Sequence, residues 1–526
     1  MPMKYLVRGA LVLVTVLVSA GAWAAETGPD KIMASTADHS TFQVLQQDFK
    51  TGPEVTKACL TCHTNAAKQV MKTEHWTWEY RDPKTHKLEG KRHVINDFCT
   101  SPETNQYHCT ECHVGYNWRD SSFNFSAPEN ETNVDCLVCH ASTRFYKKDG
   151  DNYGEPLKWV NLKKAAMSVA MPSRENCGEC HFNGGGGDGT KHGDLDSTLA
   201  APAKAEDVHM DAKGLQFECV TCHKAEGHQV PGSRYSPTAM DKMPAMIRGD
   251  HEHGRNPVTC QSCHGQKPHK LAKMNDHTDK IACQTCHIPA FARGGQPTRL
   301  TWDWSTAGKR DKNGKAFDTL NDDGFPVYRS VMGTFTWQEN VVPEYLWFNG
   351  TVNWLTVGEK FDPSKAPITI NTYEGSSADG KSMIWPVKIF RGKQMYDSIN
   401  NYLIVAHLAG NAEDPTAYWV NLDWDKAITD GMKRANLPYS GKYGFIATQT
   451  IWPITHMVAP KEKALACADC HASNGRLEQI KGIYIPGRGS DHLRWLEFAG
   501  WTLAALTLLV ALVHGMGRII ASSRRK

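Results

Sequence analysis

The sequence carries almost no net charge, because 59 basic residues face 56 acidic residues and leave a formal charge of +3 at pH 7. This balance argues against a protein that binds nucleic acid by neutralising phosphates. Apolar residues make up 40% and charged residues 22% of the chain, so most of it is neither membrane-like nor disordered. A length of 526 residues is enough for several domains or one large domain.

Cysteine is nearly absent outside one pattern, since sixteen of the seventeen cysteines lie in C-x-x-C-H motifs. In such a motif two thiols attach a haem c covalently, and the adjacent imidazole binds the iron from the proximal side. The motifs are Cys59, Cys62 and His63; Cys109, Cys112 and His113; Cys136, Cys139 and His140; Cys177, Cys180 and His181; Cys219, Cys222 and His223; Cys260, Cys263 and His264; Cys283, Cys286 and His287; and Cys467, Cys470 and His471. One copy would also be compatible with a redox pair or half a zinc site. Eight copies predict eight covalently attached haem c groups.

The motifs do not repeat at a fixed period, because successive first cysteines of the first seven motifs are 23 to 50 residues apart. This irregularity excludes a solenoid repeat. Seven motifs fall within residues 25–290, and so many haems in so short a stretch must pack against one another. We therefore expect a multihaem cytochrome c fold that is mainly α, with extensive loops and short helices around eight packed haems.

The next region, residues 291–471, lacks such motifs until its end but is rich in aromatic residues. Nine of the sixteen tryptophans lie between residues 291 and 460. We interpret this region as aromatic packing over the haems, with a helix that begins near Asp423, and with the eighth motif at its end. An independent catalytic domain is the alternative, although no nucleotide-binding or nucleophile motif is present. The glycine-rich residues 472–495 are expected to form a linker.

The N-terminus has the three-part layout of a secretory signal peptide. Lys4 and Arg8 precede a short apolar run, and Ala22-Trp23-Ala24 follows it. We expect residues 1–24 to be removed on export, with an uncleaved anchor as the alternative. Export agrees with haem c, which bacteria attach outside the cytoplasm.

The C-terminus contains twenty residues without a formal charge, from Phe498 to Gly517. At about 1.5 Å per residue this length crosses the hydrocarbon core of a bilayer. Tryptophans precede the run and basic residues follow it, which predicts a transmembrane helix at 496–520 and a cytoplasmic tail at 521–526. The haem region would then be periplasmic and anchored to the inner membrane; a buried core helix is the alternative. His514 is expected to lie near the interface rather than to ligate a haem b shared with a partner.

Sixteen histidines stand outside the motifs. Low-spin electron-transfer haems usually take a second axial ligand, which is often a histidine. The candidates for these distal ligands are His39, His75, His209, His228, His269, His277 and His456, with His253 in reserve. For each of them a surface or core histidine is the alternative interpretation.

With these features the sequence resembles the octahaem tetrathionate reductase family of multihaem cytochromes c, over roughly residues 35–480. The resemblance rests on the arrangement of seven motifs plus one and on four short segments. These are Asp38-His39-Ser40, His75-Trp76-Thr77-Trp78, Pro268-His269-Lys270 and Cys283-Gln284-Thr285-Cys286-His287-Ile288-Pro289. The resemblance implies seven haems with two histidine ligands and one haem, the second in sequence, with histidine and lysine ligands, where substrate binds.

The resemblance also implies which residues line the substrate pocket. Family members have a cysteine with an asparagine three residues before it, and a ligand lysine with an aspartate three residues before it. Cys99 and Asn96 match the first pair, and Lys191 and Asp188 match the second. The second lysine of the family pocket is assigned to Lys270. The C-terminal membrane helix departs from the soluble pattern of the family and leaves the electron donor open.

The chemistry of these residues suits a reductase. A lysine binds iron only when its amine is neutral, which burial and the iron both favour. A second lysine that stays cationic would attract a small anionic substrate, and Cys99, if ionised, would allow sulfur exchange. Asp188 would orient Lys191 or relay protons. The alternatives are a small buried apolar role for Cys99 and a solvated surface position for Lys191.

The sequence therefore predicts a periplasmic, membrane-anchored reductase. Electrons from a quinol-oxidising or cytochrome b partner would reach the second haem and reduce a sulfur or nitrogen compound such as tetrathionate, nitrite or hydroxylamine. One alternative is an electron conduit between the quinol pool and periplasmic partners, which needs every haem saturated with ligands and no pocket. The other is an oxidase of hydroxylamine or of a reduced sulfur compound.

Overall fold

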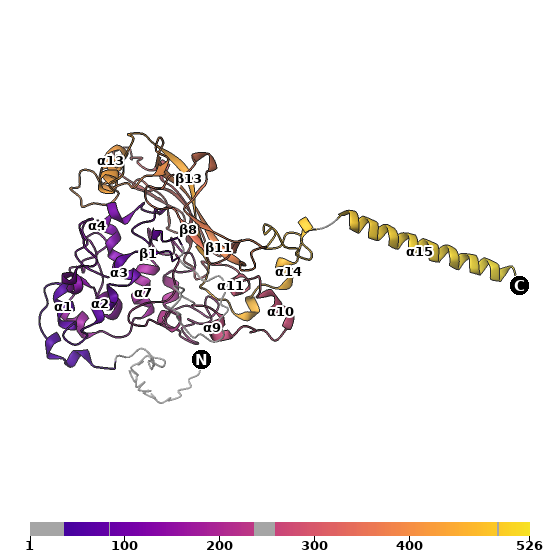
Figure 1. The fold of residues 1–526 in the computed structure, drawn as a ribbon, viewed down its shortest axis with the longest axis horizontal. Helices are drawn as coiled ribbons and strands as arrows, with labels where there is room; N and C mark the ends of the chain where they lie inside the picture. Colours follow the sequence, from indigo (N-terminus) through magenta and orange to yellow (C-terminus); the bar gives the residue numbers. More distant parts are fainter. Residues whose placement is uncertain (1–35, 84, 236–257, 492–493, 526) are drawn as a thin grey trace, which may run out of the picture.

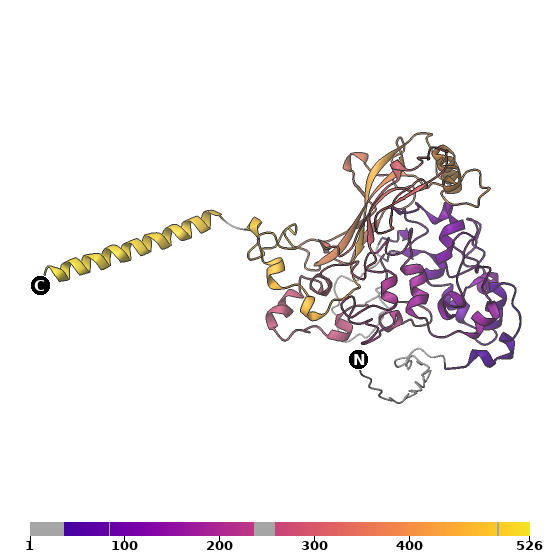
Figure 2. The ribbon, with the colours of Figure 1, turned by 180° about the vertical axis from the view of Figure 1, so that it is seen from behind.

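A computed structural model describes residues 36–83, 85–235, 258–491 and 494–525. The predicted signal peptide and His253 lie outside the described residues. Short helices, loops and one small strand pair make up the described chain as far as the seventh motif, and a large β-sheet follows (Figure 1). Figure 2, from behind, shows the long C-terminal helix α15 apart from both.

The helices before the sheet are short, and most of them carry a C-x-x-C-H motif or end at one. They are α1 (Gly52–Cys59), α2 (Ala66–Val70), α3 (Glu74–Thr77), α4 (Gln106–Cys109), α5 (Leu137–His140), α6 (Leu162–Met167), α7 (Arg174–His181), α8 (Cys219–Cys222), α9 (Gln261–His264), α10 (Ala272–His277) and α11 (Cys283–His287). Helices of this length are unstable alone in water. Their stability must therefore come from tertiary contacts and, in the mature protein, from attached haem.

Local capping explains where two of these helices begin. The side chain of Thr51 accepts a hydrogen bond from the backbone N–H of Glu54 and starts α1, which ends at Cys59 of the first motif. Ser173 starts α7 through a capping box with Asn176. Each such cap satisfies N–H groups that have no partner within the helix. The caps thus fix the helices that present the motif side chains.

The region after residue 297 forms a mixed β-sheet of nine strands, which corrects the expectation of a mainly α fold. Its order is β4-β5-β6-β3-β11-β13-β9, and β7 and β12 pair with β11 as well. The strands are β3 (Thr298–Asp303), β4 (Asp318–Leu320), β5 (Pro326–Arg329), β6 (Gly333–Gln338), β7 (Glu344–Phe348), β9 (Ile368–Thr369), β11 (Met383–Asp397), β12 (Tyr402–Leu403) and β13 (Tyr443–Pro453). Two small antiparallel pairs stand outside it: β1 (Tyr80–Arg81) with β2 (Leu88–Glu89), and β8 (Val352–Trp354) with β10 (Asn371–Tyr373).

The central strand β11 explains why the sheet gives no clear signal in the sequence. Only one of its fifteen residues is exposed. A strand that is covered on both faces does not alternate apolar and polar residues, so the period of two that marks a half-buried strand is missing. The abundant tryptophans of this region, such as Trp302 and Trp452, pack in the core of the sheet.

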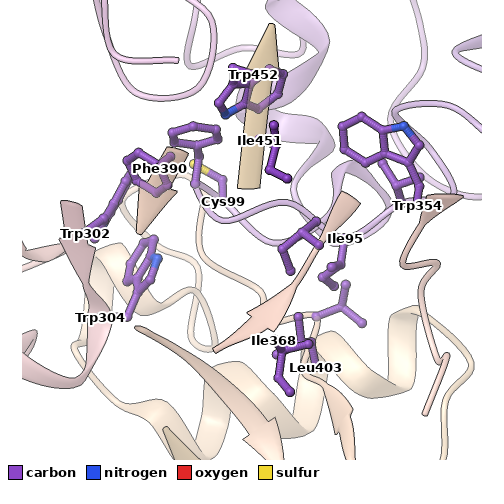
Figure 3. Packing of buried hydrophobic residues seen from close by; sticks show 14 of the residues in the cluster. Ile95, Cys99, Trp302, Trp304, Trp354, Ile368, Phe390, Leu403, Ile451 and Trp452 are labelled. Carbon is purple, nitrogen blue, oxygen red and sulfur yellow. The ribbon is translucent and has the colours of Figure 1, made fainter. Parts of the chain in front are cut away.

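The sheet core also holds the segment that precedes the second haem motif. Phe98 and Cys99 belong to the same buried cluster as Trp302, Phe390 and Trp452 (Figure 3). The ring of Phe98 lies 4.9 Å from that of Phe390 on β11. Burial of such aromatic side chains contributes strongly to stability. The sheet therefore acts as the scaffold for the loop in front of the second motif.

The expected helix near Asp423 is confirmed. α13 (Trp424–Arg434) follows α12 (Tyr418–Asn421), and the side chain of Asp423 accepts a hydrogen bond from the backbone N–H of Lys426. Aspartate at this position satisfies one of the free N–H groups of the first turn. The sequence signal here is local, which is why it predicts the structure well.

The C-terminal segment after α14 (Cys467–Cys470) packs against the body before α15 begins. Leu477, Ile480 and Ile485 form a buried cluster with Ile384 of β11, so these residues of the predicted linker pack against the sheet. α15 (Arg494–Ser523) is the one helix of the described residues that is long and apolar enough to cross a membrane. Its side chains are exposed almost throughout.

The two ends of the molecule carry different motifs. Figure 1 shows α1 and α2 at the end away from α15, and α10, α11 and α14 at the end nearest to it. The eighth motif, on α14, therefore lies on the side of the apolar helix.

Candidate functional site

Seven proximal histidines each lie opposite one of the seven candidate distal histidines. The ring centroids are 6.3 Å apart for His63 and His39, 6.4 Å for His140 and His228, 6.3 Å for His181 and His75, 6.3 Å for His223 and His456, 6.0 Å for His264 and His209, 5.9 Å for His287 and His269, and 6.1 Å for His471 and His277. Metal–nitrogen bonds of about 2.0–2.1 Å on both sides of one iron give a centroid separation of roughly 6 Å. The pairs therefore fit an iron between them.

The hydrogen bonds of these imidazoles also suit iron ligation. Seven rings engage a protein oxygen through Nδ1, which leaves Nε2 available. The rings and their partners are His140 with Ala170, His223 with Pro231, His471 with Pro486, His228 with Gln69, His269 with Asn275, His277 with Lys273, and His456 with Asp194. Such a partner orients the ring and sets its tautomer. Burial lowers the pKa of His181 to about 3, which keeps this imidazole in the neutral form that a metal needs.

His113 of the second motif has a different environment. Its ring is fully buried, with ring centroids 5.1 Å from Trp76 and 5.0 Å from Trp118. Its Nε2 lies 2.8 Å from the carbonyl oxygen of Trp76. Among the ring contacts of the described residues, none joins His113 to another histidine. Iron ligation through this Nε2 requires that the contact with Trp76 be given up.

The motifs lie next to one another in a definite order. Thiols of different motifs make side-chain contacts: Cys59 with Cys136, Cys112 with Cys180, Cys177 with Cys219, and Cys260 with Cys283. Electrostatic neighbours extend this order: Cys139 with Cys177, Cys222 with Cys260, and Cys286 with Cys470. The order is first, third, fourth, fifth, sixth, seventh and eighth, and the second motif branches from the fourth. The packing of α7 against α5 and against the turn Thr110–Cys112 agrees with it.

A tight turn presents the unpaired cysteine. Oδ1 of Asn96 accepts hydrogen bonds from the backbone N–H groups of Phe98 at 3.0 Å and Cys99 at 2.9 Å. Its Nδ2 donates to the carbonyl oxygen of Thr100 at 2.8 Å. An asparagine side chain that bonds the backbone two and three residues ahead stabilises such a turn. Asn96 thus positions Cys99, and no contact with a bound molecule is needed to explain it.

Cys99 is buried next to several cations. Burial raises the pKa of its thiol to about 12, against the opposing charges of Arg299, Lys91 and Lys191. The thiol therefore stays protonated near neutral pH, and the ionised form considered from the sequence is disfavoured here.

The backbone of Lys191 is fixed from the sheet. Lys388, a buried residue of β11, donates hydrogen bonds from Nζ to the carbonyl oxygens of Thr190 at 2.9 Å and Lys191 at 3.0 Å. The glycines before this segment include Gly186 and Gly187 with φ of 110° and 123°, a conformation that side chains rarely adopt. The four-glycine run thus allows the backbone conformation that brings Lys191 to the sheet.

The side chain of Lys191 lies among aromatic rings. Its Nζ is 5.2 Å from the ring centroid of Trp452 and 5.8 Å from that of Phe98. Burial lowers its pKa well below the ordinary value, and the charges of Arg234 and Lys91 lower it further. The neutral amine is the form that can bind a metal. Cys112 of the second motif and Asp97 are the anionic neighbours that oppose this shift.

Two residues predicted for the pocket, Asp188 and Lys270, have other surroundings in the structure. The carboxylate of Asp188 accepts hydrogen bonds from the backbone N–H of Ser197 at 2.8 Å and from its hydroxyl, and within the described residues it makes no hydrogen bond or ion pair with Lys191. Lys270 is exposed, and its neighbour His269 faces the seventh motif. In the described residues Arg234 and Lys91 take the place of this second cation beside Lys191.

Asp97 is the functional candidate that sequence reasoning missed. It is fully buried, and its carboxylate accepts hydrogen bonds from the hydroxyl of Thr450 on β13. Burial raises its pKa to about 7, while Thr450, Lys191 and Lys388 oppose the shift. Its position between Asn96 and Cys99 was the available signal, because it places a titratable group inside the turn.

Two family models match parts of the chain. Residues 36–141 match cytochrome c554 and c-prime, and residues 299–474 match bacterial cytochrome c. An uncharacterised protein of Archaeoglobus fulgidus is 26% identical over an alignment of 278 residues, and the match covers 43% of this chain and 91% of that protein.

A solved structure matches far more of the chain. The octahaem cytochrome c of Shewanella oneidensis is 42% identical, with a TM-score of 0.73 over 84% of this chain and 95% of that one. The eight C-x-x-C-H motifs and the seven histidine pairs of this chain are what an octahaem cytochrome c requires. On this evidence the chain belongs to the octahaem cytochromes c.

Proposed function

We propose that the protein is a periplasmic, membrane-anchored octahaem reductase that reduces a sulfur or nitrogen compound at its second haem motif. The observation that carries the proposal is the contrast between the motifs. Seven proximal histidines face a second histidine, whereas in the described residues His113 faces none and Lys191 lies near its motif. A site with one exchangeable ligand is the place where a substrate can bind.

The proposal assigns eight haem c groups, seven of them held between the histidine pairs. For the second motif it assigns His113 as proximal ligand and Lys191 as distal ligand, after His113 has released the carbonyl of Trp76. Bound haem supplies one-electron chemistry between neighbouring attachment sites and an iron that accepts axial ligands. The chain's own contribution is to hold, orient and charge these positions.

The order of the motifs supports an electron input near the membrane. The eighth motif lies at the end of the molecule nearest to α15, and the second motif branches from the fourth. We infer that a quinol-oxidising or cytochrome b partner donates at the eighth motif. The first and third motifs then form a side branch rather than part of the route to the second motif.

The side chains around Lys191 support a small anionic substrate such as tetrathionate or nitrite; hydroxylamine is the neutral candidate. Arg234 and Lys91 supply positive charge, and Lys191 itself is held neutral by burial. The buried carboxyl of Asp97 can hold a proton beside the pocket, because its pKa is raised to about 7. Cys99 offers a protonated thiol from the neighbouring turn. A reduction that consumes protons needs such donors within a desolvated site.

Methyl-viologen-driven reduction by the purified holoprotein tests the proposal. Tetrathionate, nitrite, hydroxylamine and sulfite are offered in turn, and oxidation of the reduced dye is followed by absorbance. We expect turnover with at least one acceptor. If none of these acceptors oxidises the dye in a protein that carries all its haems, the result would favour the conduit. If the protein instead transfers electrons only from hydroxylamine or a reduced sulfur compound to an oxidised dye, the result would favour the oxidase.

A further inference from the structure

Three buried hydrogen-bond donors near Lys191 have no partner in the described chain. They are the indole N–H groups of Trp354 and Trp452 and the hydroxyl of Tyr373. Trp354 and Trp452 are 2% exposed, and Tyr373 is 9% exposed. A buried donor without an acceptor is destabilising, and native proteins rarely leave several together. The cluster therefore indicates a bound acceptor.

The three donors come from strands that meet at one end of the sheet core. Trp354 ends β8 and Tyr373 ends β10, and the register Asn371 to Trp354 and Tyr373 to Val352 sets both side chains on the same face of the pair. Trp452 comes from β13, and its ring centroid lies 6.3 Å from that of Trp354. Figure 3 shows both indoles at the same end of the buried cluster.

Arg234 brings a positive charge to the same place. Its guanidinium carbon lies 5.7 Å from the ring of Trp354 and 5.4 Å from the ring of Trp452. It donates one hydrogen bond, to the hydroxyl of Tyr235 at 2.6 Å, and its charge acts on the Tyr373 hydroxyl as well. Within residues 36–83, 85–235, 258–491 and 494–525 it makes no ion pair.

Two carboxyl groups nearby accept no hydrogen bond from these three side chains in the described residues. One is Glu89, whose Oε1 accepts a hydrogen bond from the backbone N–H of Trp354 at 3.3 Å, and the other is Glu74. Glu74 acts on Arg234 electrostatically and accepts a hydrogen bond from Ser233, and burial raises its pKa to about 7. None of the three free donors bonds to it. An indole N–H can only donate, so the missing partner must be rich in acceptors and preferably negative.

We propose that Arg234, Trp354, Trp452 and Tyr373 form a binding site for an oxyanion beside Lys191. Trp452 belongs to this site and also contacts Lys191, because Nζ of Lys191 lies 5.2 Å from the ring centroid of Trp452. The oxyanion is either the free substrate of the proposed reductase, a small sulfur or nitrogen oxyanion, or a propionate carboxylate of an attached haem. Both sources offer the same chemistry. If the oxyanion is the substrate, the inference rests on the proposed function. If it is a haem propionate, the inference does not depend on turnover.

Anion binding to the oxidised holoprotein tests the site without any catalytic step. Sulfite and nitrite are titrated calorimetrically into wild type and into Tyr373→Phe, Trp452→Phe and Arg234→Met. Trp419→Phe is the matched control, because within the described residues it removes another buried indole N–H that has no hydrogen-bond partner. A hydrogen bond to a charged group is strong, so each site variant should weaken anion binding roughly tenfold, whereas the control should not.

A second measurement distinguishes the two sources. If haem propionate occupies the site, the three variants leave anion affinity unchanged but shift the reduction potential of one haem and its propionate bands in the resonance Raman spectrum. Haem content by pyridine haemochrome shows that each variant is loaded like wild type. The proposal is overturned if loaded site variants match Trp419→Phe in anion affinity, potentials and propionate bands alike. A wild-type holoprotein that binds the anions but reduces none of the offered acceptors would contradict the proposed reductase and leave the binding site standing.

Discussion

The paired-histidine sites and the second motif place different groups opposite the proximal imidazole. At seven motifs two rings face each other at 5.9 to 6.4 Å, and many of them are oriented by an oxygen on Nδ1. At the second motif His113 packs against tryptophans in tilted and edge-on contacts, and a lysine of lowered pKa lies nearby with two further cations. Two strong ligands suit an iron that only passes electrons. A neutral amine among cations suits an iron that exchanges a ligand for an anion.

Removing the distal lysine should give the largest effect. Lys191→Ala takes away the only protein ligand proposed for the distal side of the second haem, so viologen-driven turnover should fall roughly 100-fold or more. The matched control is His39→Ala, which opens the first haem on the side branch and should leave most of the turnover. Steady-state assays at equal haem content compare the two. Equal losses would mean that the second motif is not special.

Changing the unpaired cysteine should have a smaller and more selective effect. Cys99→Ala leaves both proposed ligands of the second haem in place, so its spectrum should stay like wild type. Turnover of tetrathionate should fall roughly tenfold if the thiol takes part in sulfur chemistry, while nitrite reduction should change little. Parallel assays with the two acceptors measure the difference. Equal changes with both acceptors would assign Cys99 a packing role.

Replacing Asp97 should change the pH dependence of the free energy of unfolding rather than the haem ligands. Its folded-state pKa of about 7 lies above the ordinary value of 3.8. Its contribution to stability is therefore fully present below about pH 3.8 and is lost as the pH rises through about 7. Asp97→Asn is neutral throughout and should gain up to about 4 kcal/mol over wild type across this window. Thermal unfolding at a series of pH values checks it; identical pH slopes would contradict the burial of a charged carboxylate.

Deleting the apolar tail should affect the haem sites least. Removal of residues 498–526 takes away exposed helix only and leaves the buried contacts of Leu477, Ile480 and Ile485. The truncated protein should be soluble, keep its haems and keep viologen-driven turnover within about twofold. Fractionation and haemochrome assay measure this. Loss of haem on truncation would mean that α15 is part of the fold of the motifs.

The haem sites were accessible from the sequence because their signals are local and covalent. A C-x-x-C-H motif by itself predicts covalent haem attachment. The seven histidines outside the motifs that are predicted as distal ligands each lie opposite a proximal ring in the structure. The start of α13 at Asp423 was likewise a local cap. Local rules of this kind need no knowledge of distant contacts.

The sheet and the surroundings of Lys191 were not accessible in the same way. β11 is buried on both faces and shows no alternation. Arg234, Asp97 and Trp452 meet Lys191 only through long-range packing of separate segments. No spacing in the sequence encodes these contacts, so the family resemblance assigns the second cation to Lys270, whereas in the described residues Arg234 and Lys91 lie beside Lys191. Asp188 matches a family spacing, yet here its carboxylate bonds to Ser197.

Magnetic circular dichroism in the near infrared tests the central contrast most directly, because ferric haems with histidine and lysine ligands absorb there at a different energy from those with two histidines. The account predicts, for oxidised wild type, one histidine–lysine signal beside the histidine–histidine signals of seven haems. Lys191→Ala should lose the first signal and keep the others. A wild-type spectrum with histidine–histidine signals alone, unchanged in Lys191→Ala, would contradict the account and leave the protein as an electron conduit.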